Sequence, residues 1–171
     1  MKYMLTGASR TPALMRLTLS CTLVFLGCLW ISNGLLYFSH MNLDPHSVLR
    51  YYLGSEEEFA SPRTYASMLE ATHMHLAMMA LVLLLLTHLA IFIPWPVRLL
   101  VALVLGTFAS GLLEEGAGWL VRFVHPGFAW LKVLSFVALQ ANLLVLLAGL
   151  AWHLNRRPPS PRLPETDESF E

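Results

Sequence analysis

The stretch LEATHMHLAMMALVLLLLTHLA, from Leu69 to Ala90, decides the fold. Most of its residues are apolar, and about 20 such residues of helix cross the ~30 Å hydrocarbon layer of a membrane. Within lipid a single segment satisfies its own backbone hydrogen bonds only as a helix. The stretch therefore predicts a membrane-spanning helix. It is unusual because it also carries three histidines, at positions 73, 75 and 88.

The rest of the chain repeats this apolar character. A window of about 19 residues finds four apolar blocks, at 13–38, 71–93, 97–113 and 128–154. Hydrophobic residues make up 56 % of the 171 residues and charged residues only 13 %. The first block is longer than a signal-peptide core of ~7–15 residues, so we expect an uncleaved first helix. The expected fold class is all-α, an integral membrane four-helix bundle.

The domain organisation follows from these blocks. Residues 1–154 are expected to form the four-span bundle, with an outer loop over residues 39–70. In that loop, Tyr51 and Tyr52 next to Arg50 predict a short amphipathic helix on the outer membrane surface. Ser61 is the predicted N-cap of the helix that continues into the second span. Residues 155–171 are Pro-rich and polar, which predicts a disordered cytoplasmic tail.

The basic residues predict the orientation in the membrane. With a cytoplasmic N-terminus, seven of the eleven Lys and Arg residues lie inside and four lie outside. The positive-inside rule therefore favours N-in/C-in and a multi-pass protein of the bacterial inner (cytoplasmic) membrane. The net charge is zero and there is no basic patch, which argues against nucleic acid as a partner. No nucleophile motif or phosphate loop is present, so no catalytic residue is assigned and enzyme activity is left open.

The histidine spacing suggests a haem b site. His73 and His88 are fifteen residues apart, so they differ by only about 60° around a helix and share one face. His153, at the end of the fourth span, falls in the same half of the bundle as His88. Imidazoles from two helices are common axial ligands of haem iron. His73, His88 and His153 are therefore candidate haem ligands in a component of membrane electron transfer, with His40 or His125 as a further ligand.

A second hypothesis is a copper or iron site on the periplasmic side. Glu70 and His73 have the i, i+3 spacing of carboxylate-bridged metal bundles. His75, Glu114 and His125 are expected at the same level of the membrane. His73 and His75 point about 160° apart on a regular helix, so they cannot both bind one ion.

A third hypothesis is a non-enzymatic structural or assembly subunit of a membrane complex, whose histidines only tie helices together. In this interpretation Arg122 forms an interfacial ion pair with Glu114 or Glu115. Gln140 and Asn142 would form interhelical hydrogen bonds, and a quinone contact is an alternative for them. Expected partners are membrane lipid, other membrane subunits, or a basic periplasmic redox protein that docks on the acidic residues 56–58.

Three motifs carry a resemblance to a known family. They are SEEE at 55–58, EATHMHL at 70–76 and PGFAWLK at 126–132. In combination they resemble a family of small bacterial inner-membrane proteins with four spans, over about Gly34 to Ser135. That resemblance implies the fold and the membrane location. In outline the chain is also similar to four-helix b-type cytochromes, which would imply bound haem.

Overall fold

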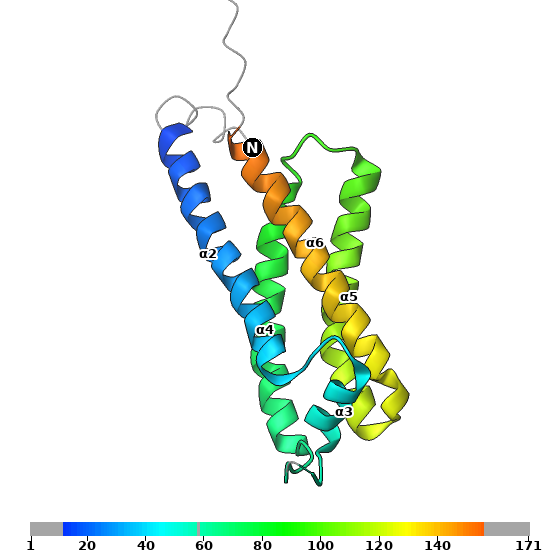
Figure 1. Cartoon of the computed structure of the whole chain (residues 1–171). Coiled ribbons are helices and arrows are strands. Elements are labelled where there is room, and N and C mark those ends of the chain that lie inside the picture. Colours follow the sequence, from blue (N-terminus) through cyan, green and yellow to red (C-terminus); the bar gives the residue numbers. More distant parts are fainter. Residues whose placement is uncertain (1–11, 58, 156–171) are drawn as a thin grey trace, which may run out of the picture.

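The computed structural model describes residues 12–57 and 59–155. These residues are helical, apart from the turns and loops between the helices (Figure 1). The elements are α2 (Pro12–His40), α3 (Pro45–Leu53), α4 (Tyr65–Ala90), α5 (Val97–Phe123), the 3-10 helix η1 (Pro126–Phe128) and α6 (Ala129–Asn155). In the described part of the chain, four helices are long and apolar enough to cross a membrane. The prediction of an all-α, four-helix membrane bundle is confirmed.

Helix α6 forms the core of the bundle. Half of its most apolar window, 50 %, is buried, compared with 6 % for α2. Helix α6 packs against each of the other α-helices, whereas α2 lies mainly against α6 and makes little contact with α4. The outer faces of the long helices expose large apolar side chains such as Phe25, Leu81 and Leu105. Such a surface is suited to lipid, so the protein is a multi-pass membrane protein.

Helix α3 closes one end of the bundle, which we call the α3 end (Figure 1). The Asp44 carboxylate caps α3 by accepting the backbone N–H of Ser47 at 2.9 Å, and this hydrogen bond lowers the pKa of Asp44. Gly54, with φ at 85°, ends the helix. The amphipathic helix is confirmed, but its side chains Val48 and Tyr52 are buried in the bundle. Helix α3 therefore packs on α5 and α6 and does not only rest on the membrane surface.

Two predicted helix boundaries differ from the structure. The third span was expected to end at residue 113, but α5 continues to Phe123. The charges of Glu114 and Glu115 end the apolar window, yet both carboxylates have partners inside the bundle. The Ser61 N-cap is wrong, because α4 begins at Tyr65 and the Thr64 hydroxyl accepts the N–H of Ser67 at 3.2 Å.

The first residues of α2 and the last residues of α6 lie at the end of the bundle opposite to α3 (Figure 1). The start of α2 and the end of α6 therefore face the same side of the membrane, while the N-in/C-in orientation itself stays a prediction. The predicted disordered tail at 155–171 lies outside the described residues, except for Asn155, which ends α6. Glu58 of the acidic loop also lies outside them.

Candidate functional site

A cavity of about 690 Å³ lies inside the bundle and reaches the α3 end. Helices α2, α4, α5 and α6 form its walls, and α3 and the following loop close it. Its two halves differ in character. The half nearer α3 is lined by the polar and charged residues Thr72, His75, Glu114, Glu115, Trp119 and Lys132. The other half is lined by apolar residues that include Leu26, Leu83, Leu86, Leu139, Leu143 and Leu147.

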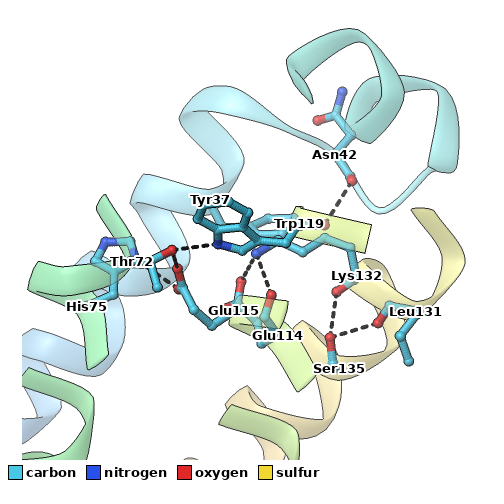
Figure 2. A network of polar contacts seen from close by, with 10 residues as sticks. All are labelled: Tyr37, Asn42, Thr72, His75, Glu114, Glu115, Trp119, Leu131, Lys132 and Ser135. Carbon is cyan, nitrogen blue, oxygen red and sulfur yellow. Dashed lines mark hydrogen bonds and ion pairs between the residues drawn. The ribbon is translucent and has the colours of Figure 1, made fainter. Parts of the chain in front are cut away.

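A buried ion pair joins α5 to α6 at the polar half of the cavity (Figure 2). The Lys132 ammonium donates to the Glu114 carboxylate and to the Glu114 backbone carbonyl, the latter at 2.8 Å. Only 5 % of Lys132 is exposed. A buried ammonium is tolerated only when it is paired and hydrogen-bonded. The ion pair therefore fixes the first turn of α6 against the C-terminal half of α5.

A second polar group joins α4 to α5 (Figure 2). The Thr72 hydroxyl donates to Oε1 of Glu115 at 2.5 Å and accepts the indole N–H of Trp119 at 2.9 Å. Nδ1 of His75 lies 3.3 Å from the other oxygen, Oε2, of the same carboxylate. The His75 side chain is half exposed while Glu115 is mostly buried. The imidazole and carboxylate can together take up or release a proton at the cavity wall.

Helix α3 closes the polar half of the cavity through Tyr52. The phenol lies directly against the backbone of Gly118, where an added Cβ would be 2.6 Å from the Tyr52 hydroxyl oxygen. Burial raises the pKa of the Tyr52 phenol above its ordinary value. Beside it, Tyr37 of α2 stacks on Phe136 with 3.6 Å between ring centroids. Glycine at position 118 is therefore what allows α3 to approach α5 so closely.

The rim of the cavity at the α3 end is aromatic and basic. The Arg63 guanidinium donates to the Tyr51 hydroxyl at 2.6 Å and lies 4.3 Å above the centroid of the same ring. His40 stacks on Tyr51 with 5.3 Å between centroids. The predicted ion pair of Arg122 with Glu114 or Glu115 is wrong. Arg122 instead donates to the backbone carbonyl of Arg63 at 2.8 Å, while Lys132 pairs with Glu114 and Glu115 contacts Thr72 and His75.

The three predicted haem ligands do not line this cavity. His73 has an exposed side chain, and so does His88, which lies edge-on to Phe92 with 5.9 Å between ring centroids. His153, near the end of α6, is half-buried. The histidines that do line the cavity are His75 and His40. The haem site at positions 73, 88 and 153 stays a prediction.

The five predicted metal ligands are not brought together. Glu70 and His73 are exposed, Glu114 pairs with Lys132, and Nδ1 of His125 accepts the N–H of Gly127 at 2.9 Å as the cap of η1. Within residues 12–57 and 59–155, no three His, Cys, Asp or Glu side chains lie close enough to hold a metal ion. The prediction that His73 and His75 point to different sides of the helix is consistent with the structure. His75 contacts Glu115 and lines the cavity, whereas His73 lies outside the cavity.

Sequence reasoning missed Lys132, Thr72 and Tyr52 as members of the site. Lys132 could have been found from the sequence, because an ionisable residue within a span marks a functional position and requires a partner of opposite charge. Thr72 and Tyr52 had no such signal. A threonine and a tyrosine near a membrane interface are common, and only the packing of α3 and α5 brings them to the cavity.

Comparison with known proteins identifies the family. A family model described as a transmembrane helical domain, Aq_1264_TM, matches residues 42–161. The match covers more than half of the chain, so the protein belongs to this family. Neither a curated protein nor a solved structure matches the chain. The family supports a helical membrane protein, and the chemistry has to be argued from the cavity.

Proposed function

We propose that this member of the Aq_1264_TM family binds a lipid-soluble carrier of the quinone class and serves membrane electron transfer, in the bacterial inner membrane. One observation carries the proposal: the cavity has a polar, titratable half at the α3 end and an apolar half deeper in the bundle. A quinone has the matching shape, with a flat ring whose carbonyl oxygens accept hydrogen bonds and an apolar tail. Ligand sites of this kind are mostly apolar with a few polar groups that orient the ligand.

The charges of the polar half favour an electrically neutral head group. Two carboxylates, Glu114 and Glu115, line the cavity together with two cations, Lys132 and Arg63. Lys132 is already neutralised by Glu114. A phosphate-bearing lipid would leave an excess negative charge in a medium of low dielectric, which is costly. A neutral quinone ring beside Trp119 and the tyrosines avoids this cost.

The cavity has an opening through which such a ligand can arrive from the lipid. Side chains that both line the cavity and are exposed mark this opening. They are Leu29, Ser32, Asn33, Leu36 and His40 on α2, and Ala71, His75 and Met78 on α4. Because α2 makes little contact with α4, the opening lies between these two helices. A ligand dissolved in the bilayer can therefore enter sideways.

The pair His75 and Glu115 suits the chemistry of a quinone. Reduction of a quinone to a hydroquinone adds two electrons and two protons, one proton to each carbonyl oxygen. The imidazole of His75, held by the Glu115 carboxylate, can donate a proton to one oxygen or accept one in the reverse reaction. The other oxygen would exchange its proton with water that enters at the α3 end. The electrons would come from, or go to, a haem or iron–sulfur protein bound as a partner subunit or periplasmic redox protein.

A binding experiment tests the proposal. The protein is reconstituted in lipid nanodiscs and titrated with decylubiquinone, and binding is measured by quenching of tryptophan fluorescence. Loss of one hydrogen bond of ~0.5–1.5 kcal/mol in His75→Ala is expected to weaken binding about two- to tenfold. His73→Ala is the matched control, because His73 lies on the same helix but outside the cavity. Absence of binding to the unaltered protein, or an equal loss in both variants, contradicts the proposal.

Haem b and a copper or iron site remain separate predictions with their own measurement. A reduced-minus-oxidised visible spectrum of the purified protein is recorded together with elemental analysis. A haem α-band that is lost in His88→Ala supports haem held by His73, His88 and His153. Stoichiometric copper or iron without a chromophore supports the metal site. If neither signal nor quinone binding is found, a structural or assembly subunit is the remaining interpretation.

A further inference from the structure

We infer that the ligand is long-tailed, and that its hydrocarbon chain lies in a groove between α2 and α4 that continues from the cavity toward the end opposite to α3. This inference rests on the proposed function and names the class of quinone, one with a polyprenyl tail. The proposal is carried by the observation that two hollows on α2 and α4 adjoin at Leu26.

The groove is a second hollow of about 600 Å³ on the lipid side of the bundle. It is lined by Leu17, Thr18, Cys21, Thr22, Phe25 and Leu26 of α2, and by Leu85 of α4. Its two threonines offer no free donor to a ligand. The Thr18 hydroxyl donates to the carbonyl of Leu14 at 3.0 Å, and the Thr22 hydroxyl donates to the carbonyl of Thr18 at 2.9 Å. The groove therefore presents methyl, methylene and ring groups, as a hydrocarbon chain requires.

The groove and the cavity adjoin at Leu26, which lines both of them. On α2 the cavity extends from Leu26 to His40, and the groove extends from Leu17 to Leu26. At a rise of 1.5 Å per residue, the path from Leu17 to His40 is about 35 Å long. A ring with a short substituent fills only its polar end, whereas a long tail uses the whole path.

A hydrocarbon chain suits this path better than a helix from a second copy of the chain. A helix is about 10 Å wide, and a hydrocarbon chain is much thinner. The thinner occupant can follow the groove into the interior of the bundle, where buried side chains such as Leu83 and Leu86 line the cavity.

The two cysteines of α2 provide the test, because both side chains are exposed. Cys21 lines the groove, whereas Cys28, seven residues later, lines neither hollow. Single-cysteine proteins, C28S and C21S, are placed in nanodiscs and their labelling by N-ethylmaleimide is timed. A polyprenyl quinone is expected to slow labelling of Cys21 several-fold and to leave Cys28 unchanged. The same ring with a methyl group in place of the tail is expected to bind without protecting either cysteine.

A second variant measures the groove without labelling. Cys21→Trp fills the groove, and it is expected to weaken binding of the polyprenyl quinone while binding of the short-tailed ring is unchanged. Cys28→Trp is the matched control and is expected to alter neither.

Three results would overturn the inference, and they differ from failure of the proposed function. The first is binding of the polyprenyl quinone without protection of Cys21, which leaves the quinone site standing and removes the groove. The second is protection of Cys21 in the absence of quinone. If this protection increases with protein concentration, a second copy of the chain occupies the groove. The third is a failure of every quinone to bind, which removes the proposed function and the groove together.

Discussion

His75 and His88 lie on the same helix, thirteen residues apart, and both are exposed, but they have different neighbours. Near the α3 end, His75 faces the Glu115 carboxylate of α5 and lines the cavity. Toward the opposite end, His88 is exposed and contacts the ring of Phe92, a residue just beyond the end of its own helix. The comparison teaches that an imidazole in a span gains a chemical role from what the neighbouring helix offers, and not from its depth alone.

The same contrast holds for the two halves of the bundle. The half near α3 has a polar interior that links α4, α5 and α6 through Thr72, Glu115, Glu114 and Lys132 (Figure 2). The opposite half is held by a cluster of leucines and other apolar side chains. In the polar half specific partners are required, because an unpaired polar group in a medium of low dielectric is costly. In the apolar half similar side chains can replace each other.

The largest effect is expected from removing the cation of the polar half. Lys132→Met leaves the Glu114 carboxylate buried without its partner, which typically costs about 3–5 kcal/mol. Stability is measured by unfolding in mixed micelles of dodecyl maltoside and sodium dodecyl sulfate, followed by circular dichroism. The double variant Lys132→Met with Glu114→Gln is expected to recover part of the loss. If the double variant is less stable than either single variant, the pair is not the reason for the effect.

The next effect concerns the contact that closes the polar half. Gly118→Ala places a methyl group against the buried Tyr52 phenol, and overpacking of this kind costs about 1–3 kcal/mol. Gly116→Ala is the control on the same helix, since nothing lies within 4 Å of its added Cβ. It is expected to be neutral or slightly stabilising, because alanine favours helix over glycine. Equal unfolding midpoints for the two variants would rule out the close packing of α3 on α5.

A smaller effect is expected from the hydroxyl that joins α4 to α5. Thr72→Val removes the acceptor of the Trp119 indole and a donor to Glu115, at a net cost of about 0.5–1.5 kcal/mol. The emission maximum of Trp119 should shift because its N–H loses its partner. Thr87→Val on the same helix is the comparison, because the Thr87 hydroxyl donates only to backbone carbonyls of its own helix. A shift of similar size in Thr87→Val would mean that the network is not its cause.

The smallest effect is a pH dependence of α3. The hydrogen bond from Ser47 lowers the folded pKa of Asp44, so the cap stabilises α3 above the unfolded pKa of about 4. This stabilisation is lost as the pH falls through the lower folded value. Pepsin cleavage near the end of α3 is expected to accelerate in that range for the native protein relative to Asp44→Asn, which caps without titrating. Parallel pH profiles for the two proteins would show that Asp44 does not hold α3.

Much of the fold could be predicted because lipid imposes simple rules. The number of spans and the short helix around Tyr51 and Tyr52 follow from segment length and local residue preferences. The end of the third span could not be predicted from the sequence. Two adjacent carboxylates, Glu114 and Glu115, indicate the membrane interface unless their partners on α4 and α6 are known.

The sequence by itself determined that four helices cross a membrane and that His73 and His75 point to different sides of α4. Only the tertiary structure decided that His75 meets Glu115, that Lys132 pairs with Glu114, and that a cavity reaches the α3 end. The physical reason is the solvent. In water a helix marks its buried face by an apolar stripe, but in lipid every face of a helix is apolar. The inward faces, and with them the members of the site, are therefore set by how the helices rotate and pack against each other.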